Sequence, residues 1–425
     1  MAIMNTLMQF DSGEEFADIV SHDTYVAGVP HSTFKRMREQ APVQWVDEDD
    51  GSGFWAVTGY PELLEVARDY KRFTAELGIR LEEMDAEVTD ARRSMMELDP
   101  PRHTRLRRLV QRGFTKRMVE TYEASFRLLT AAVFEEILAE KTEFDFVTEI
   151  SRELPMRLLC RLLGVPDDEA KQLVEWGDGM IANTDSEFTD HVVDQSDTEE
   201  FRLLPFRSPS ALKVIELAAR AASQRRIEPT DDIISTLLAT PPDGEPLTDA
   251  EFYNFFALLV VAGNETTRHT ITHGLLALLE HPDQMHKWMA DANVSLTAAD
   301  EILRWSTVTM HFRRTATQDT ELGGKAIKKG DKVVMYYISA NFDERQFPEP
   351  YVFDLTRSPN EHVAFGYMSA HRCLGEWLAR LEVKVTFEEL FKRIKHIEVV
   401  GPADRLRSNF IAGIKHLPVR VERAD

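Results

Sequence analysis

The stretch Phe365-Gly366-Tyr367-Met368-Ser369-Ala370-His371-Arg372-Cys373-Leu374-Gly375 places one cysteine between a loop and an apolar helical pattern. That pattern predicts a helix from 374 to about 393. A thiol at the start of a helix lies near the positive end of the helix dipole, which favours the thiolate, a metal ligand. Gly375 leaves room for a large flat group against the first turn. Cys373 is therefore a candidate metal ligand, although a free cysteine is more often a small buried hydrophobe.

The composition limits the kind of partner. The chain has 425 residues, with 50 basic and 72 acidic side chains and a formal net charge of −22. Contacts to phosphate need clustered Lys and Arg, so this balance argues against nucleic acid. Cys160 and Cys373 are too few for a disulfide framework, which indicates a reducing compartment. The first residues show no signal-peptide pattern, and the longest apolar run, 255–263, is too short to span a bilayer. We expect a cytoplasmic protein that does not enter the membrane.

Hydrophobic periodicity predicts a mostly helical chain with a β-rich minority near 42–60 and 307–340. The first β-rich region has two strand-like runs around an acidic, Gly-containing turn, the pattern of a hairpin. A long helix is predicted over 248–279, because Thr248 and Glu251 form a capping box at its start. No composition break or low-complexity linker interrupts the sequence. We therefore expect one domain over 1–425.

Small and polar side chains interrupt the long helix at Ala262-Gly263-Asn264-Glu265-Thr266-Thr267. Gly in a helix interior costs about 1 kcal/mol relative to Ala, so it needs a reason. Ala262 and Gly263 would let a flat ligand press on the helix. Thr266 shares a face with Ala262, and its hydroxyl is expected to bond to the carbonyl four residues back. Glu265 and Thr266 could pass protons to a bound species. The alternative is a buried amphipathic helix without chemistry.

Two further helical segments carry charged pairs. Glu301 and Arg304 are three residues apart and share a helix face, where such a pair is most often a surface ion pair worth a few tenths of a kcal/mol. His103 and Arg107 are four residues apart in a helix that follows Asp99-Pro100-Pro101. They could bind an anion, and a solvated basic first turn is the alternative.

His269 and His273 are spaced as two zinc ligands on one helix face. A third ligand and the Glu of a His-Glu-x-x-His motif are missing, so surface or core histidines are favoured. The sequence contains no P-loop, dinucleotide-binding glycine fingerprint or Gly-x-Ser-x-Gly elbow.

Five segments, in this order, resemble motifs of the cytochrome P450 family. They are residues 99–107, 262–267, 301–304, 347–357 and 365–375. The first resembles the family's propionate-binding helix start, the second its oxygen-binding motif, and the last its cysteine loop. The resemblance extends over most of the chain and implies the mostly α prism fold of a soluble bacterial-type member.

The resemblance also implies roles for individual residues. Cys373 would be the axial ligand of the iron of haem b. The residues that would contact the haem or its propionates are His103, Arg107, Arg314, His371, Ala262 and Phe365. Thr266, backed by Glu265, would supply protons during oxygen activation. Glu301, Arg304 and Arg357 would hold the fold near the haem rather than act in catalysis.

The implied activity is insertion of one oxygen atom from O2 into an apolar small molecule. Similarity to family branches that act on aliphatic compounds favours hydroxylation of a terpenoid, a steroid or another aliphatic substrate. The expected substrate-pocket residues are Val261, Val308, Met310 and Phe312. Electrons would come from a separate ferredoxin or flavodoxin with its reductase, since no bound flavin or nicotinamide is expected in this chain, and the protein would be a monomer. The basic residues Arg105, Arg108, Arg112 and Arg372 are candidates for the docking patch of an acidic ferredoxin.

Two alternatives stay open: a peroxide-using haem-thiolate enzyme, and a haem-binding family member without catalytic activity. The acid–alcohol pair Glu265 and Thr266 argues against both. The cysteine loop also departs from the family pattern, because Ser369 stands where the family usually has Gly. A positive φ there would cost Ser369 about 1 kcal/mol. We expect haem to bind still, with altered hydrogen bonding around the sulfur and weaker retention.

Overall fold

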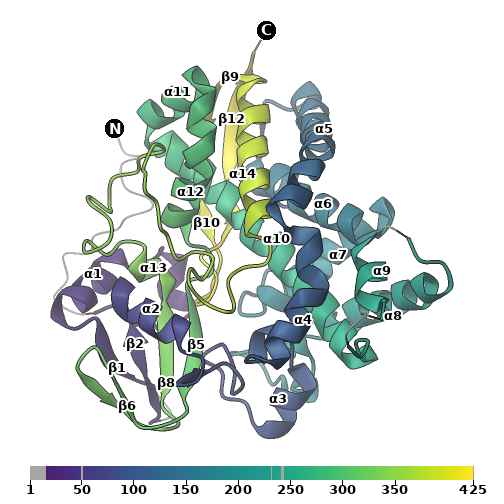
Figure 1. Ribbon diagram of the computed structural model, residues 1–425. Helices are drawn as coiled ribbons and strands as arrows, with labels where there is room; N and C mark the ends of the chain where they lie inside the picture. The colour runs from purple at the N-terminus through teal and green to yellow at the C-terminus, as the bar shows by residue number, and fades with distance from the viewer. Residues whose placement is uncertain (1–15, 49–50, 231, 241–243, 425) are drawn as a thin grey trace. The chain divides into compact units, whose positions relative to one another are not determined.

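The computed structural model describes residues 16–48, 51–230, 232–240 and 244–424. Its packing divides the chain into two compact units (Figure 1). Unit 1 is formed by the described residues of Met1–Glu83, His269–Cys373 and Phe391–Asp425, and unit 2 by Met84–Arg268 and Leu374–Leu390. Each unit is described by itself below.

Unit 1 contains a five-stranded sheet with the order β1-β2-β8-β5-β3. Its strands are β1 (Val43–Asp47), β2 (Gly53–Val57), β8 (Lys332–Tyr336), β5 (His311–Ala316) and β3 (Phe73–Thr74). The hairpin predicted near 42–60 is β1 and β2, with Trp45 opposite Trp55; the tip of its turn, residues 49–50, lies outside the described residues. β2 and β8 run parallel, although they come from distant parts of the chain (Figure 1).

The helices α1 (His31–Gln40), α2 (Tyr60–Arg68) and α13 (Tyr337–Ala340) pack against this sheet (Figure 1). Val57, Leu63 and Met335 belong to the buried core that the sheet shares with α2 and α13. The other elements of unit 1 are α11 (Pro282–Ala290), α12 (Ser295–Ser306), β6 (Thr320–Leu322), β7 (Lys325–Ile327), β9 (Ile394–Val399), β10 (Asp404–Arg405), β11 (Ile414–His416) and β12 (Pro418–Arg423).

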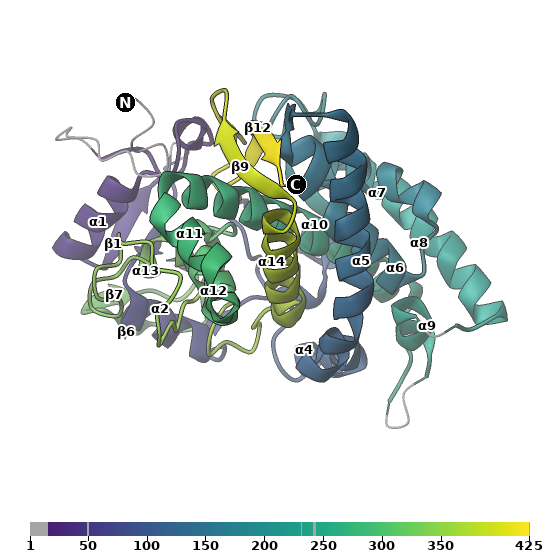
Figure 2. The ribbon, with the colours of Figure 1, turned by 90° about the horizontal axis from the view of Figure 1, so that it is seen from above.

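Unit 2 is built from helices. They are α3 (Ala86–Arg92), α4 (Arg102–Val110), α5 (Lys116–Glu140), α6 (Glu153–Leu163), α7 (Asp167–Ile181), α8 (Ser210–Ile227), α9 (Ile233–Leu238), most of α14 (Glu376–Phe391) and the first part of α10 (Asp249–Glu280). Helices that are neighbours in the chain also pack side by side: α5 contacts α6, α6 contacts α7, and α7 contacts α8 (Figure 2). The capping box at the start of α10 is present: Thr248 N–H donates to Glu251 Oε2 at 2.9 Å, and Glu251 N–H donates to Thr248 Oγ1 at 3.2 Å.

The predicted fold class, mostly α with a minor β region, is confirmed. Local differences have local causes. The stretch around 143–151, expected to be helical, forms the short strand β4 (Glu143–Asp145) and a π-helical turn at Val147–Ser151. There the Asp145 carboxylate accepts a hydrogen bond from Val147 N–H at 2.8 Å, which starts a new turn. The last helix begins at Glu376 rather than at 374. None of the described helices combines the length and apolar character needed to cross a bilayer.

Candidate functional site

The cysteine loop of unit 1 is closed by main-chain hydrogen bonds. Cys373 N–H donates to the carbonyl of Phe365 at 2.8 Å, which joins the two ends of the loop. Gly366 has φ of +68°, a conformation that favours glycine, and its N–H donates to Val363 O at 2.8 Å. Cys373 is exposed, whereas Cys160 is buried. The loop therefore presents one accessible thiol just before a helix.

The strain expected at Ser369 is not there. Met368, not Ser369, adopts the left-handed conformation, with φ of +65°. Ser369 instead accepts a hydrogen bond at Oγ from His371 N–H at 3.0 Å, and its N–H donates to Gly366 O at 3.1 Å. The side chain of Ser369 thus stabilises the turn that precedes the cysteine, and the positive φ that would have strained this residue is not present.

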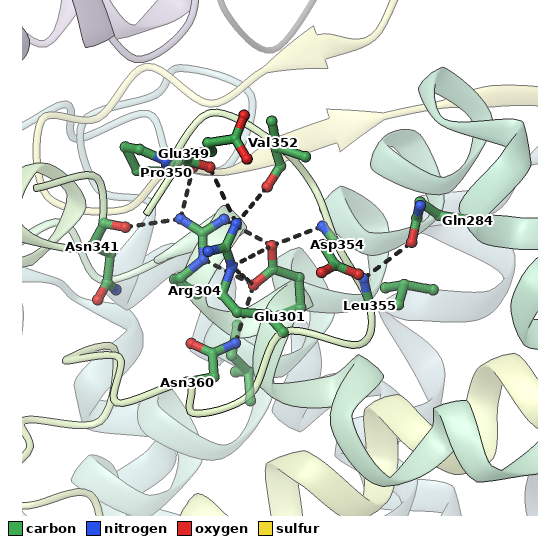
Figure 3. A network of polar contacts seen from close by, with 12 residues as sticks. Gln284, Glu301, Arg304, Asn341, Glu349, Pro350, Val352, Asp354, Leu355 and Asn360 are labelled. Atoms are coloured by element: carbon green, nitrogen blue, oxygen red, sulfur yellow. Dashed lines mark hydrogen bonds and ion pairs between the residues drawn. The ribbon is translucent and has the colours of Figure 1, made fainter. Parts of the chain in front are cut away.

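Glu301, Arg304 and Arg357 form a buried charge network in unit 1 (Figure 3). Arg304 donates from Nε and Nη2 to the two oxygens of Glu301, both at 2.8 Å, and neither side chain is exposed to solvent. Arg357 Nε lies 3.2 Å from Glu301 Oε2. The pair is therefore not the surface ion pair that its spacing usually indicates.

The same network fixes the irregular segment 348–360. Arg304 Nη1 donates to the carbonyl of Pro350 at 2.9 Å, and Arg357 donates to the carbonyls of Pro348 and Val352, each at 2.8 Å (Figure 3). Main-chain carbonyls in a segment without helix or strand need such donors. Arg304 and Arg357 therefore connect helix α12 to this segment, and their structural role near a haem stays a prediction.

Asn341 connects this network to the cysteine loop, and sequence reasoning missed it. Its carbonyl accepts from Arg304 Nη1 at 2.9 Å, and its side-chain Oδ1 accepts from Val363 N–H at 2.8 Å. Its Nδ2 donates to Thr307 Oγ1 at 2.8 Å. No motif or periodicity in the sequence marks Asn341, because its partners lie far away along the chain.

The predicted pocket residues of unit 1 lie beside strand β5. Val308 and Met310 are buried and Phe312 is half-buried. Met310 N–H donates to Phe410 O at 2.9 Å, and the rings of Phe312 and Phe410 are 5.6 Å apart. Phe410, near the end of the chain, is thus a further apolar neighbour that the sequence did not point out.

Arg314 and His371, the predicted propionate ligands of unit 1, lie on β5 and in the cysteine loop. Arg314 is buried, and its Nη1 donates to the carbonyl of Arg313 at 2.7 Å. His371 is half-buried, two residues before Cys373.

In unit 2, helix α10 carries the acid–alcohol pair. Thr266 Oγ1 donates to Ala262 O at 2.8 Å, as predicted for a hydroxyl that bonds four residues back. Ala262 is exposed and Val261 is buried. A Cβ atom at Gly263 would lie 3.0 Å from Leu159 of α6, so this glycine allows close packing of two helices. The expectation that Gly263 makes room for a flat ligand was therefore wrong, and the expectation stays for Ala262.

Glu265 belongs to a buried chain of charges. Its carboxylate is ion-paired with Arg268, whose Nη1 lies 2.9 Å from Asp178 of α7. Arg152 reaches the other oxygen of Asp178 at 2.6 Å. Burial lowers the pKa of Arg268, and the charge of Asp178 opposes this effect. Sequence reasoning missed Arg268 and Asp178; the buried face of α10 was the signal, since a charge on that face needs a partner.

Helix α4 carries the other predicted propionate ligands. His103 is buried, and its main-chain N–H donates to the carbonyl of Asp99 at 3.0 Å. Arg107, one turn later, is half-buried. Of the candidate docking residues, Arg105 is 3.1 Å from Glu251, Arg108 is exposed, Arg372 lies over the ring of Tyr367, and the side chain of Arg112 lies outside the described residues.

His269 and His273 are core histidines in unit 1. His269 Nδ1 accepts from Ile414 N–H at 3.2 Å, and His273 Nε2 lies 2.9 Å from Ala412 O. Burial lowers the pKa of His273 to about 3. Both rings are buried, as the core-histidine alternative requires. Within the described ranges no third His, Cys or carboxylate joins them at metal-ligand distance.

Comparison with known proteins identifies the class. The family model described as Cytochrome P450 matches residues 54–415. The chain is 38% identical over 402 residues to a steroid C26-monooxygenase of Mycolicibacterium smegmatis, covering 92% of this chain and 90% of that protein. It is 36% identical to a methyl-branched lipid omega-hydroxylase of Mycobacterium tuberculosis H37Rv, with coverage of 92% and 91%.

A solved structure of a Mycobacterium marinum cytochrome P450 in complex with pseudoionone superimposes with a TM-score of 0.86. That structure is 35% identical and covers 96% of this chain and 100% of its own. The chain therefore belongs to the cytochrome P450 family. It is a P450 monooxygenase, and membership implies a haem cofactor and O2 as co-substrate.

Proposed function

We propose that residues 1–425 act as one haem-thiolate monooxygenase domain that hydroxylates an aliphatic small molecule, a terpenoid, a steroid or a methyl-branched chain. The observation that carries the proposal is the accessible thiol of Cys373 at the end of a loop closed onto Phe365. A thiolate donor set of this kind fits the iron of haem b. Bound haem supplies oxygen activation, and the protein supplies positioning, protons and exclusion of water.

Cys373 is the proposed axial ligand, and Phe365 and Ala262 are proposed haem contacts. His103, Arg107, Arg314 and His371 are the proposed partners of the propionates, since cationic donors bind carboxylates through charge-assisted hydrogen bonds. These roles rest on the residue-by-residue match to the family motifs. The closed loop and the exposed Ala262 methyl group support them locally.

Thr266 is the proposed proton donor during oxygen activation, with Glu265 as the acid behind it. The hydroxyl of Thr266 keeps a fixed direction because it is bonded to Ala262 O. The carboxylate of Glu265 is ion-paired with Arg268, so it has to exchange this partner before it can serve Thr266. A positioned proton donor typically contributes about 10²–10⁴-fold to a rate.

The substrate class is supported by the relatives, which are named for oxidation of steroids and methyl-branched lipids. Val261, Val308, Met310 and Phe312 are the proposed pocket residues, and their apolar side chains suit such a ligand.

Electrons are proposed to come from a ferredoxin or flavodoxin with its reductase, with the exposed Arg108 in the docking patch.

The test of the haem-thiolate proposal is the absorption spectrum of the reduced, CO-bound protein. A Soret band at the thiolate position supports it, and Cys373→Ser should abolish that band, while Cys160→Ser should keep it. A band at the position of a neutral axial ligand in the unmodified protein would contradict the proposal.

Titration with steroids, methyl-branched fatty acids and terpenoids, followed by the low-to-high-spin shift, then tests the substrate class. Reduction by an acidic ferredoxin that is slowed by Arg108→Glu, but not by Arg220→Glu, tests the docking patch.

A further inference from the structure

The loop 406–413 joins β10 to β11 and carries Phe410, whose ring contacts the proposed pocket residue Phe312. β10 and β11 form a sheet of only these two strands. A two-stranded ribbon is marginally stable by itself, so the position of its loop depends on contacts with other segments. Two segments of unit 1 supply such contacts, one from the side of β5 and one from the beginning of the chain.

The first contact comes from the residues that lead into β5. Met310 N–H donates to Phe410 O at 2.9 Å, and Ala412 N–H donates to Val308 O at 2.8 Å. The ring of Phe410 also lies 5.4 Å from the ring of His311. These main-chain bonds place Phe410 directly beside the proposed pocket residues Val308 and Met310.

The second contact comes from residues 18–24, which we name the clamp segment. His22 Nδ1 lies 3.0 Å from the main-chain nitrogen of Asn409. A main-chain N–H can only donate, so this ring nitrogen is the acceptor. The side chain of Asn409 donates in turn from Nδ2 to the carbonyl of Val20. Because Asn409 directly precedes Phe410, both bonds act on the residue next to the aromatic ring.

The bonds of Asn409 are the stronger part of this connection. Asn409 is buried, and a buried polar group that loses its partner is costly. Arg407 also reaches Asp23 of the clamp segment at 2.5 Å, but the Asp23 side chain is 71% exposed, so this ion pair contributes little. His22 and Val20 therefore hold the loop more firmly than Asp23 does.

The clamp segment is itself fixed to unit 1. Tyr25, just after it, is buried, and its hydroxyl donates to the carbonyl of Ile19 at 3.0 Å. Just before it, Ala17 N–H donates to Thr33 Oγ1 of α1 at 3.0 Å. The segment is thus anchored at both ends and can act as a support for the loop.

We propose that the clamp segment, acting through His22 and Asn409, holds Phe410 beside the substrate pocket and thereby raises the affinity for the apolar substrate. The inference rests on the proposed monooxygenase function, which gives this pocket its ligand. A pocket that is only partly in its binding conformation binds more weakly by that fraction, so fixing the loop strengthens binding. His22 and Asn409 are positioning residues, since they act through Phe410.

The first experiment needs no substrate. Hydrogen exchange of the main-chain amides in 406–413 is measured on the full chain as purified, for the unmodified protein and for His22→Ala, His22→Asn and His286→Ala. Loss of the acceptor in His22→Ala should speed exchange about two- to tenfold, the factor that one hydrogen bond contributes. His22→Asn should keep the slow rate, because the amide oxygen of Asn can accept the same bond.

His286, exposed on α11, is the matched control, and His286→Ala should leave exchange in 406–413 unchanged. Equal rates in His22→Ala and His286→Ala would overturn the proposal, whatever the CO spectrum shows.

The second experiment measures substrate binding and turnover. With a steroid or a methyl-branched fatty acid that gives a spin shift, His22→Ala should raise Kd and KM about two- to tenfold. The value of kcat should stay within about twofold, because the clamp segment affects binding and not the chemical step. His22→Asn should restore the affinity, and Asp23→Asn should change it less than His22→Ala does.

The CO spectrum of each variant separates the two proposals. Unchanged affinity in His22→Ala, with the thiolate band present, would overturn the role of the clamp segment and leave the proposed function standing. A missing thiolate band in the unmodified protein would overturn the proposed function, and the exchange rates would still decide whether residues 18–24 hold the loop.

Discussion

Arg268 joins Glu265, three residues earlier on α10, to Asp178 of α7, and all three side chains are buried. The two acids therefore share one guanidinium, and Asp178 is held in addition by Arg152. The acid of the proposed proton path is thus not an isolated side chain but one end of a chain of charges that ties two helices of unit 2 together.

We expect Arg268→Met to lower the free energy of unfolding by about 3–5 kcal/mol, because it leaves two buried carboxylates without their shared partner. Urea unfolding at neutral pH measures this value. The matched control is Arg220→Met: Arg220 lies 3.1 Å from Glu169, but its side chain is largely exposed, so its loss should cost under about 1 kcal/mol. Equal small losses in the two variants would contradict this account of Arg268.

Glu301→Gln should destabilise the protein by about 3–5 kcal/mol, since Arg304 would keep its buried charge and lose its counter-charge. Limited proteolysis should then cut within 348–360, whose carbonyls Arg304 and Arg357 hold. Glu398→Gln removes an exposed carboxylate 2.9 Å from Arg420 and serves as the control. If cleavage within 348–360 stays as slow as in the control, the network does not hold this segment.

Met368→Gly should stabilise the cysteine loop by about 1 kcal/mol. A left-handed φ is unfavourable for a residue with a side chain, whereas glycine adopts it without this penalty. Ser369→Gly should not stabilise it, since Ser369 has no positive φ and its Oγ accepts a bond from His371 N–H. The midpoint of thermal unfolding and the rate of haem loss measure both effects. The reverse order of the two variants would show that Ser369 carries the strain after all.

Thr266→Ala should divert electrons from product to hydrogen peroxide and lower product yield by about tenfold or more, as expected for loss of a positioned proton donor. The control is Thr130→Ala, which removes the same type of hydroxyl bond, Thr130 Oγ1 to Phe126 O at 2.9 Å, from helix α5. Peroxide release and product yield are measured together. Similar yields in the two variants would mean that the hydroxyl of Thr266 only shapes the helix.

His311→Phe should flatten the loss of stability in acid. Burial lowers the pKa of His311 to about 3, while a histidine in the unfolded chain titrates at about 6.5. Between these values only the unfolded chain binds the proton, so stability is complete above pH of about 6.5 and falls as the pH drops toward about 3.

One proton corresponds to about 1.4 kcal/mol per pH unit, and His311→Phe should reduce the slope by up to that amount. Phe fits the site because His311 packs between the rings of Tyr336 and Phe410. Urea unfolding at about pH 7 and about pH 5 gives the slope. An unchanged slope would mean that His311 is protonated in the folded protein.

The sequence predicted features that depend on neighbours along the chain. The capping box of Thr248 and Glu251, the back-bond of Thr266 and the hairpin of β1 and β2 all follow from local sequence patterns. The family motifs added Arg357, which lies 56 residues from its partner Glu301 along the sequence.

What the sequence could not predict depends on contacts across the fold. Gly263 looked like a ligand contact, but its missing side chain is explained by Leu159, about one hundred residues away. Strain was considered at Ser369 because the family usually has Gly at this position. In the structure the left-handed φ is found at Met368 instead. Asn341 and Asp178 lie in no motif, and only their burial and their partners make them visible.

The segment 348–360 is held by bonds to its main-chain carbonyls from Arg304, outside the segment, and from Arg357, within it. Arg304 and Arg357 donate to the main-chain carbonyls of Pro348, Pro350 and Val352, and these bonds do not involve the side chains of the three residues. Substitutions at the exposed Val352, whose carbonyl alone takes part, should therefore be tolerated, while a single inserted or deleted residue would move the carbonyls out of reach. We therefore expect related chains to keep the length of this segment more strictly than the identity of residue 352.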